Sequence, residues 1–191
     1  MKVVAFNCSP HKDGNTARML RAVLEVLEAE GIETEFIQVG GRLLQGCTAC
    51  GTCKRDKNLR CSLPDDGMNE FAEKMTSADG IIIGSPTFYS DLTTEAKALI
   101  DRVGYMNGGA GNRLWRKVGA SVSPARRAGS THTLDSINHF FMINEMVVVS
   151  SSYWNMSLAR LPGDYESDEE GVRTMHNLGK NMAWVLKKLG N

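Results

Sequence analysis

The sequence has no excess of charge, because 22 lysine and arginine residues balance 22 aspartate and glutamate residues. It therefore has no overall electrostatic attraction for nucleic acid or for an anionic membrane. It also lacks any apolar run near the ~18 residues of a membrane-spanning helix, and the apolar run at residues 3–6 is too short for a signal peptide. We expect a cytoplasmic protein whose partners are small molecules or proteins, not nucleic acid or membrane.

Two common nucleotide-binding motifs are missing as well. Without a Walker A lysine and Ser/Thr pair an NTPase is disfavoured, and without G-x-G-x-x-G the chain does not bind NAD in the Rossmann manner. His132, His139 and His176 accompany no obvious nucleophile or metal-ligand set, so no apparatus for hydrolysis is visible. The 191 residues contain no internal repeat or linker, which indicates a single domain over residues 1–191.

Hydrophobic patterning predicts five strands that alternate with helices. The strands are expected at residues 3–7, 34–39, 80–84, 117–122 and 146–150, and the continuously apolar GIIIG at 80–84 is typical of a strand covered on both faces. This pattern predicts a three-layer α/β sandwich around a parallel sheet of order 2-1-3-4-5, as in flavodoxin-like folds. Ligands of such sheets lie beyond the carboxyl ends of the strands, so functional residues should follow positions 7, 84, 122 and 150.

The four clustered cysteines follow the spacing C-x2-C-x2-C-x7-C: Cys47, Cys50, Cys53 and Cys61. Two consecutive x2 spacings favour a 4Fe-4S cluster over zinc, but zinc and metal-free, redox-active thiols remain alternatives. The segment from 54 to 60 has an excess of three positive charges, which would favour the reduced form of an anionic cluster, although it can also be a solvated basic loop. Cys8 stands apart and is expected to be a small buried residue.

The segment after the first strand, residues 8–16, places hydroxyls and backbone N–H groups at a helix N-terminus, an arrangement that binds phosphate. Its Ser9, Pro10, Gly14, Asn15 and Thr16 match S-P-x-x-x-G-N-T, and here the sequence resembles the flavodoxin-like NADPH-dependent FMN reductases. Residues 78–102 resemble the second flavin loop of that family and its following helix. Within the family, the cysteine motif resembles that of the iron-sulfur flavoproteins, with the cysteine-rich loop (about 45–65) inserted between strands 2 and 3.

The resemblance implies which residues contact FMN. Ser9, Asn15 and Thr16 would hold the phosphate, with His11 facing either the phosphate or solvent. The isoalloxazine would be lined by Pro86, Thr87, Phe88 and Tyr89, and its pyrimidine edge by a third loop with Ser123, Arg126 and Gly129. The simpler alternatives are a capped strand-helix turn for the first loop and aromatic side chains that pack on the core for the second.

The resulting hypothesis is an FMN-dependent oxidoreductase or electron-transfer flavoprotein, reduced by NAD(P)H or ferredoxin and coupled to the 4Fe-4S cluster. The alternatives are a cluster-free NAD(P)H:quinone or FMN reductase, with a quinone or other small molecule as acceptor, and a non-enzymatic electron carrier. No side chain is expected to act as a catalytic acid or base, because the cofactor carries the chemistry. By the same resemblance, we expect a homodimer or homotetramer.

Overall fold

The computed structural model describes residues 1–190 and contains the parallel sheet that the sequence predicts. Five strands pair in the order β2-β1-β3-β4-β5: β1 (Lys2–Asn7), β2 (Glu33–Gln38), β3 (Gly80–Gly84), β4 (Val118–Ala125) and β5 (Val147–Val148). All four pairings are parallel. The flavodoxin-like fold is thus confirmed, and the carboxyl ends of the strands meet at one edge.

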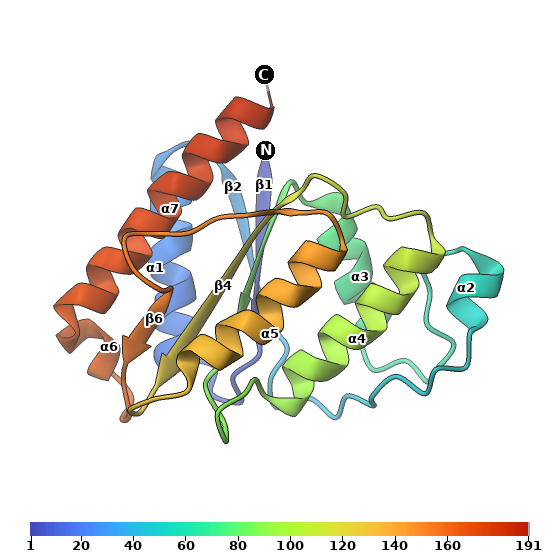
Figure 1. Cartoon of the computed structure of the whole chain (residues 1–191), viewed down its shortest axis with the longest axis horizontal. Coiled ribbons are helices and arrows are strands. Elements are labelled where there is room, and N and C mark those ends of the chain that lie inside the picture. The colour runs from blue at the N-terminus through green and yellow to red at the C-terminus, as the bar shows by residue number, and fades with distance from the viewer. Residues whose placement is uncertain (191) are drawn as a thin grey trace.

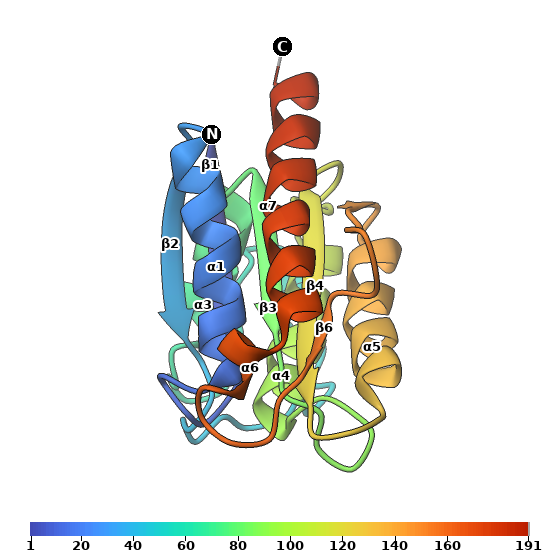
Figure 2. The ribbon, with the colours of Figure 1, turned by 90° about the vertical axis from the view of Figure 1, so that its left-hand side faces the viewer.

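Helices cover both faces of the sheet (Figure 1 and Figure 2). One face carries α1 (Asn15–Ala29) and α7 (Glu169–Leu189), whose apolar stripes pack on Val3, Ala5, Ile82 and Ala120. The other carries α3 (Met68–Ser77), α4 (Thr94–Gly109) and α5 (Ser130–Ile143). Two short helices, α2 (Thr52–Asp56) and α6 (Asp164–Ser167), lie in connecting segments. Among residues 1–190, none of the helices is both long and apolar enough to cross a membrane.

The central strands form because every residue of β3 and β4 is buried, as their apolar sequences require. Gly84 ends β3 where a Cβ atom would lie 2.9 Å from side-chain atoms of Thr16 and Leu20. Glycine therefore allows α1 to approach the end of β3 closely, which brings the loops after β1 and β3 together.

The last part of the sheet differs from the sequence prediction. The expected strand at 146–150 contains only the exposed pair Val147–Val148, which contacts the first residues of β4. After residues 149–155, the chain forms β6 (Met156–Leu158), which pairs in parallel with the last three residues of β4. Three residues carry too little periodicity to predict a strand. Because β6 pairs with the end of β4, β4 extends to Ala125, and residues 159–165 reach the ligand edge of the sheet.

Candidate functional site

A cavity of about 240 Å³ opens at the carboxyl edge of the sheet, where ligands of such folds bind. We call it the edge cavity. Eight of the eleven residues predicted to contact FMN line it: Ser9, His11, Asn15, Thr16, Pro86, Thr87, Phe88 and Arg126. Gly14, Pro124, Ala159, Arg160 and Pro162 complete its lining. Residues from four separate segments of the chain therefore surround one space.

The loop after β1, residues 8–14, is held from below by two amide side chains. Asn7 accepts a hydrogen bond from the Ser9 backbone N–H (3.2 Å) and donates one to Gln38 (2.6 Å). Gln38 in turn donates to the carbonyl oxygens of Ser9 and Gly40, each at 2.8 Å. A Cβ atom at Gly40 would lie 2.2 Å from the Ser9 carbonyl oxygen, so glycine is required for this close approach. The loop is fixed before any ligand binds.

The N-terminus of α1 points its free N–H groups toward the edge cavity. Its N-cap residue is Gly14, which has no side chain to cap these groups, and no acidic residue occupies the first turn. The hydroxyl-bearing residues Ser9 and Thr16 lie beside it, both nearly fully buried. Uncapped N–H groups and the positive end of the helix dipole form a site for an anion such as phosphate.

The Asn15 side chain holds a segment near the end of the chain against the start of α1. It donates to the Leu161 carbonyl oxygen (2.8 Å) and accepts from the N–H groups of Gly163 (3.1 Å) and Tyr165 (3.3 Å). It thereby ties residues 159–165, which we call the strap, to the start of α1. The strap carries Arg160 and Pro162 into the cavity lining. The prediction that Asn15 also contacts phosphate is untested.

The second loop, residues 85–91, is attached to β4 along its length. The N–H groups of Ser85 and Thr87 each donate at 3.1 Å, to the carbonyl oxygens of Val122 and Pro124 respectively. Phe88 and Asp91 exchange two backbone hydrogen bonds and close a turn whose tip is Tyr89 and Ser90, both with positive φ. Phe88 lines the edge cavity, whereas Tyr89 is fully exposed and does not.

Ser123 and Gly129 support the second loop from behind and do not line the cavity. Ser123 is buried, and its hydroxyl lies 3.0 Å from that of Thr87. Gly129 precedes α5 with φ +93°, and a Cβ atom there would lie 3.0 Å from Ser90 and 3.1 Å from Thr87. Of the three residues predicted in the third loop, only Arg126 lines the cavity, where its neighbour Pro124 joins it.

The sequence analysis missed Arg160, which adds a second arginine to the cavity. Its backbone N–H, like that of Leu161, donates to the Asp164 carboxylate (2.9 and 2.7 Å), and these bonds hold the pKa of Asp164 below its usual value. The turn of the strap is thereby fixed. The only feature of the sequence that could indicate a role for Arg160 is its position after the last strand, and that strand is too short to predict.

The cysteine segment, residues 45–65, lies on α4 and α3. Backbone atoms of Cys53 approach Gly109 so closely that a Cβ there would lie 2.7 Å from the Cys53 carbonyl oxygen. Asn69 of α3 accepts from the Cys61 N–H (2.7 Å) and donates to its carbonyl oxygen (3.3 Å). Buried Leu59 anchors the segment in the core, although its φ of +58° is unfavourable for leucine. Tertiary contacts therefore impose this conformation.

All four clustered cysteines line one small cavity of about 20 Å³, together with Arg102, Tyr105 and Met106 of α4. We call it the cysteine cavity. The thiols are free. Cys50 is exposed, and hydrogen bonds with Thr52 and Ser62 lower its pKa to about 6. Burial raises the pKa of Cys53. Cys8, by contrast, is fully buried near the first loop, as expected.

The donor set of the cysteine cavity suits an iron-sulfur cluster. Four thiols converge on it, and the Ala49 N–H already lies 3.4 Å from the Cys47 sulfur, as N–H groups do around cluster sulfurs. Within residues 1–190, no three His, Cys, Asp or Glu side chains are grouped around a single ion position. In a cubane cluster each cysteine binds a different iron, so its ligands are spread more widely than those around one tetrahedral ion.

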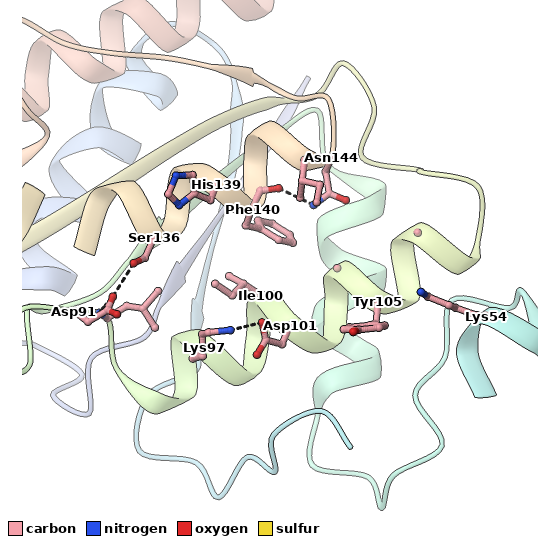
Figure 3. Close-up of a pocket in the computed structure, with 14 residues that line it drawn as sticks. Lys54, Asp91, Lys97, Ile100, Asp101, Tyr105, Ser136, His139, Phe140 and Asn144 are labelled. Carbon is pink, nitrogen blue, oxygen red and sulfur yellow. Dashed lines mark hydrogen bonds and ion pairs between the residues drawn. The ribbon is translucent and has the colours of Figure 1, made fainter. Parts of the chain in front are cut away.

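A larger cavity than the edge cavity, about 640 Å³, is a groove between α4 and α5 (Figure 3). Its lining includes the apolar side chains of Leu92, Ile100 and Phe140. Its polar groups are paired with one another: Lys97 with Asp101 (2.5 Å) and Ser136 with Asp91 (2.8 Å). None of the predicted flavin contacts lines this groove. Volume alone therefore does not identify the site, and the edge cavity has the better set of converging polar groups.

A sheet of this order, with a phosphate-type loop after β1 and an aromatic loop after β3, defines a flavodoxin-like flavoprotein. Comparison with known proteins agrees. The family described as NADPH-dependent FMN reductase matches residues 1–160. The chain belongs to this family, whose members bind FMN.

Similar proteins include two iron-sulfur flavoproteins from archaea. The one from Methanocaldococcus jannaschii is 37% identical over 194 residues and aligns with 98% of each chain. The one from Methanosarcina thermophila is 33% identical over 189 residues, which cover 98% of this chain and 96% of that one. Among solved structures, the WrbA-like flavodoxin of Agrobacterium tumefaciens has a TM-score of 0.68 at 19% identity, over 98% of this chain and 97% of its own. This last likeness shows the fold.

Proposed function

We propose that the protein is an FMN-dependent oxidoreductase in which FMN in the edge cavity exchanges electrons with a 4Fe-4S cluster held by Cys47, Cys50, Cys53 and Cys61. The observation that carries the proposal is that these four free thiols line one cavity in a chain that also has a flavin-type cradle. The two archaeal relatives described above are iron-sulfur flavoproteins, which supports the proposal.

In this proposal the edge cavity binds FMN without a catalytic side chain. The N–H groups of α1 and the hydroxyls of Ser9 and Thr16 bind the phosphate, and Arg126 and Arg160 supply positive charge. Pro86 and Phe88 pack against the ring system. When bound, FMN supplies the ability to exchange one or two electrons, and the chain orients it and restricts access of water.

A second candidate is a cluster-free reductase with reactive thiols. One observation favours it: the exposed Cys50 has a thiol pKa of about 6. A thiol with this pKa is mostly thiolate at neutral pH and reacts readily with oxidants. The two candidates differ in iron content, which is directly measurable.

For the electron donor we propose NAD(P)H or ferredoxin, and for the acceptor a quinone or another small molecule. The family description favours a nicotinamide donor. We also propose a homodimer or homotetramer, supported by large apolar side chains that lie exposed, among them Met142, Ile143 and Trp154. Apolar side chains grouped on a surface mark interaction sites.

The cluster is tested by purifying the protein without oxygen and measuring iron, sulfide, zinc and FMN. We expect about four irons and four sulfides per chain, as a cubane requires. Replacing any of the four clustered cysteines by alanine should abolish iron binding and retain FMN. Cys8→Ala is the matched control, because it removes a buried thiol outside the cysteine cavity and should retain both. Iron-free but FMN-loaded protein after anaerobic reconstitution would support the second candidate.

The donor is tested by adding NADH, NADPH or reduced ferredoxin to FMN-loaded protein under anaerobic conditions. Bleaching of the flavin band by a nicotinamide, followed by reoxidation with a quinone, would support the reductase. Bleaching by ferredoxin alone would instead indicate an electron carrier.

A further inference from the structure

Arg102 of α4 is a buried cation beside the cysteine cavity. Its side chain is 1% exposed, and it lines the cavity with the four cysteines. Charged side chains are rarely buried to this extent unless their hydrogen-bonding groups are all paired. The hydrogen-bond partners of the Arg102 guanidinium therefore indicate its role beside the cysteine cavity.

The guanidinium of Arg102 is only partly paired. Its Nη1 donates to the Gln45 carbonyl oxygen (3.1 Å) and to the Asp66 carboxylate. Its Nε has no hydrogen-bond partner, although this atom is buried. Because nearly all buried polar groups in proteins are hydrogen-bonded, an unpaired N–H beside four thiols suggests an acceptor that occupies the cysteine cavity.

The Asp66 carboxylate does not fully compensate this charge, because it is shared. It accepts from the N–H groups of Gln45 and Met68, each at 3.3 Å, as well as from Arg102. An arginine side chain stays protonated in proteins, and Arg102 lines the same cavity as Cys61. Arg102 therefore remains a cation next to Cys61.

Three of the four positive charges between residues 54 and 60 have other partners. Lys54 lies over the Tyr105 ring at 4.9 Å, Arg55 pairs with Asp56, and Arg60 pairs with Glu73. These side chains are also exposed, so water and salt screen them. The cation that acts on the cysteine cavity with least screening is Arg102.

We propose that Arg102 is a positioning residue for the cluster: its guanidinium supplies an N–H donor and a buried positive charge to the sulfur atoms and thereby raises the midpoint potential of the cluster. This inference rests on the proposed 4Fe-4S site. Reduction adds one electron, donated by the reduced flavin, and one negative charge to the cluster. A fixed cation nearby stabilises the more negative form, most strongly where solvent is excluded.

The first test is a pair of arginine variants, Arg102→Gln and Arg60→Gln, with potentials measured by EPR-monitored redox titration. Arg60 is the matched control, because it is adjacent to Cys61 in sequence but its side chain is 58% exposed. We expect Arg102→Gln to shift the cluster midpoint to a more negative value, and Arg60→Gln to shift it much less. The flavin midpoint in the same sample serves as an internal reference and should stay unchanged.

The second test is Asp66→Asn, which separates electrostatic tuning from a purely structural role. If Arg102 only anchors the cysteine segment, breaking its ion pair from either side should reduce stability and leave the potential unchanged. If its charge acts on the cluster, removing the compensating carboxylate should shift the midpoint to a more positive value, opposite to Arg102→Gln. This variant also decides the question if Arg102→Gln does not fold.

The outcomes separate this inference from the proposed function. Wild-type protein that binds no iron after anaerobic reconstitution would overturn both. Wild-type protein with a cluster whose midpoint is the same in Arg102→Gln, or is unchanged or lowered in Asp66→Asn, would overturn only the role of Arg102. Opposite shifts in the two variants, with the flavin midpoint constant, would establish it.

Discussion

The Thr93 hydroxyl donates a hydrogen bond to the carbonyl oxygen of Cys8 across 2.9 Å, joining the start of α4 to the loop after β1. The hydroxyl oxygen of Thr93 also accepts from the Ala96 N–H at 3.2 Å and so caps α4. The Thr93 N–H donates to Ser85 at 3.0 Å. The buried Thr93 therefore connects the two loops that face the edge cavity. Thr93 and Cys8 are 85 positions apart in the sequence.

Thr93→Val should destabilise the protein. It keeps the shape of the side chain but removes the helix cap and leaves the buried Cys8 carbonyl oxygen without its donor. We expect the free energy of unfolding to fall by about 1–3 kcal/mol, measured by denaturant titration. Thr93→Ser retains the hydroxyl and should remain closer to the wild type. A smaller loss in Thr93→Val than in Thr93→Ser would mean that the methyl group, not the hydrogen bonds, stabilises this junction.

Asn15→Asp should weaken FMN binding. The change places a carboxylate beside the phosphate site and removes the amide donor that holds the strap at Leu161. We expect the dissociation constant, from fluorescence titration of the apoprotein, to rise about tenfold or more, which corresponds to ~1.4 kcal/mol. The control is Asn177→Asp, which makes the same change in charge on α7, where Asn177 donates to Ser152. Unchanged affinity in Asn15→Asp would contradict the phosphate site.

Gly129→Ala should disturb the second loop. Alanine at φ +93° is strained by about 1–2 kcal/mol, and its Cβ would press on Ser90 and Thr87. Gly31→Ala is the matched control, since Gly31 has φ +79° but a Cβ atom there would meet nothing within 4 Å. Both variants should lose stability, and only Gly129→Ala should also weaken FMN binding. If FMN affinity falls equally in both, the effect does not arise at the loop.

Asp168 should make stability depend on pH in the acid range. Burial raises its pKa, but hydrogen bonds from Gly171, Ser157 and Leu158 outweigh this and hold the pKa below its ordinary value of 3.8. A carboxylate whose pKa is lowered in the folded state stabilises the fold at pH values above its pKa in the unfolded state. This stabilisation is lost as the pH falls through its pKa in the folded state.

The measurement is the melting temperature of the wild type and of Asp168→Asn between pH 7 and the acid limit of folding. We expect the variant to be less stable at pH 7 and its disadvantage to shrink below about pH 4, because the wild type then also loses its carboxylate. Asp135→Asn, which changes an exposed carboxylate on α5, controls for net charge. A disadvantage of constant size at every pH would show that the charge of Asp168 is unimportant.

The central part of the fold was predictable because local patterns and tertiary structure agree there. The apolar run at 80–84 is the fully buried β3. The small Cys8 is buried, as its position at the end of β1 suggested. At these positions the local sequence and the tertiary environment favour the same structure.

The rest of the site depends on contacts between distant residues, which no local pattern reveals. Arg160 reaches the edge cavity only because a three-residue strand pairs with the end of β4. Tyr89, predicted to contact the flavin, lies exposed at a loop tip where two consecutive residues have positive φ, a conformation that its sequence does not indicate. Arg102 lies next to an apolar stripe on α4, and its burial follows from the cysteine segment that covers it.

Helix α4 sets the separation between the two candidate redox sites. It starts at Thr94, directly after the second loop, and the cysteine cavity lies against its later turns at Arg102, Tyr105 and Met106. From Thr94 to Tyr105 the helix rises about 16 Å. Because electron tunnelling slows exponentially with distance, the length of α4 acts as an insulating spacer within one chain. The proposed exchange of electrons between a flavin and a cluster of the same chain would have to cross this length of helix.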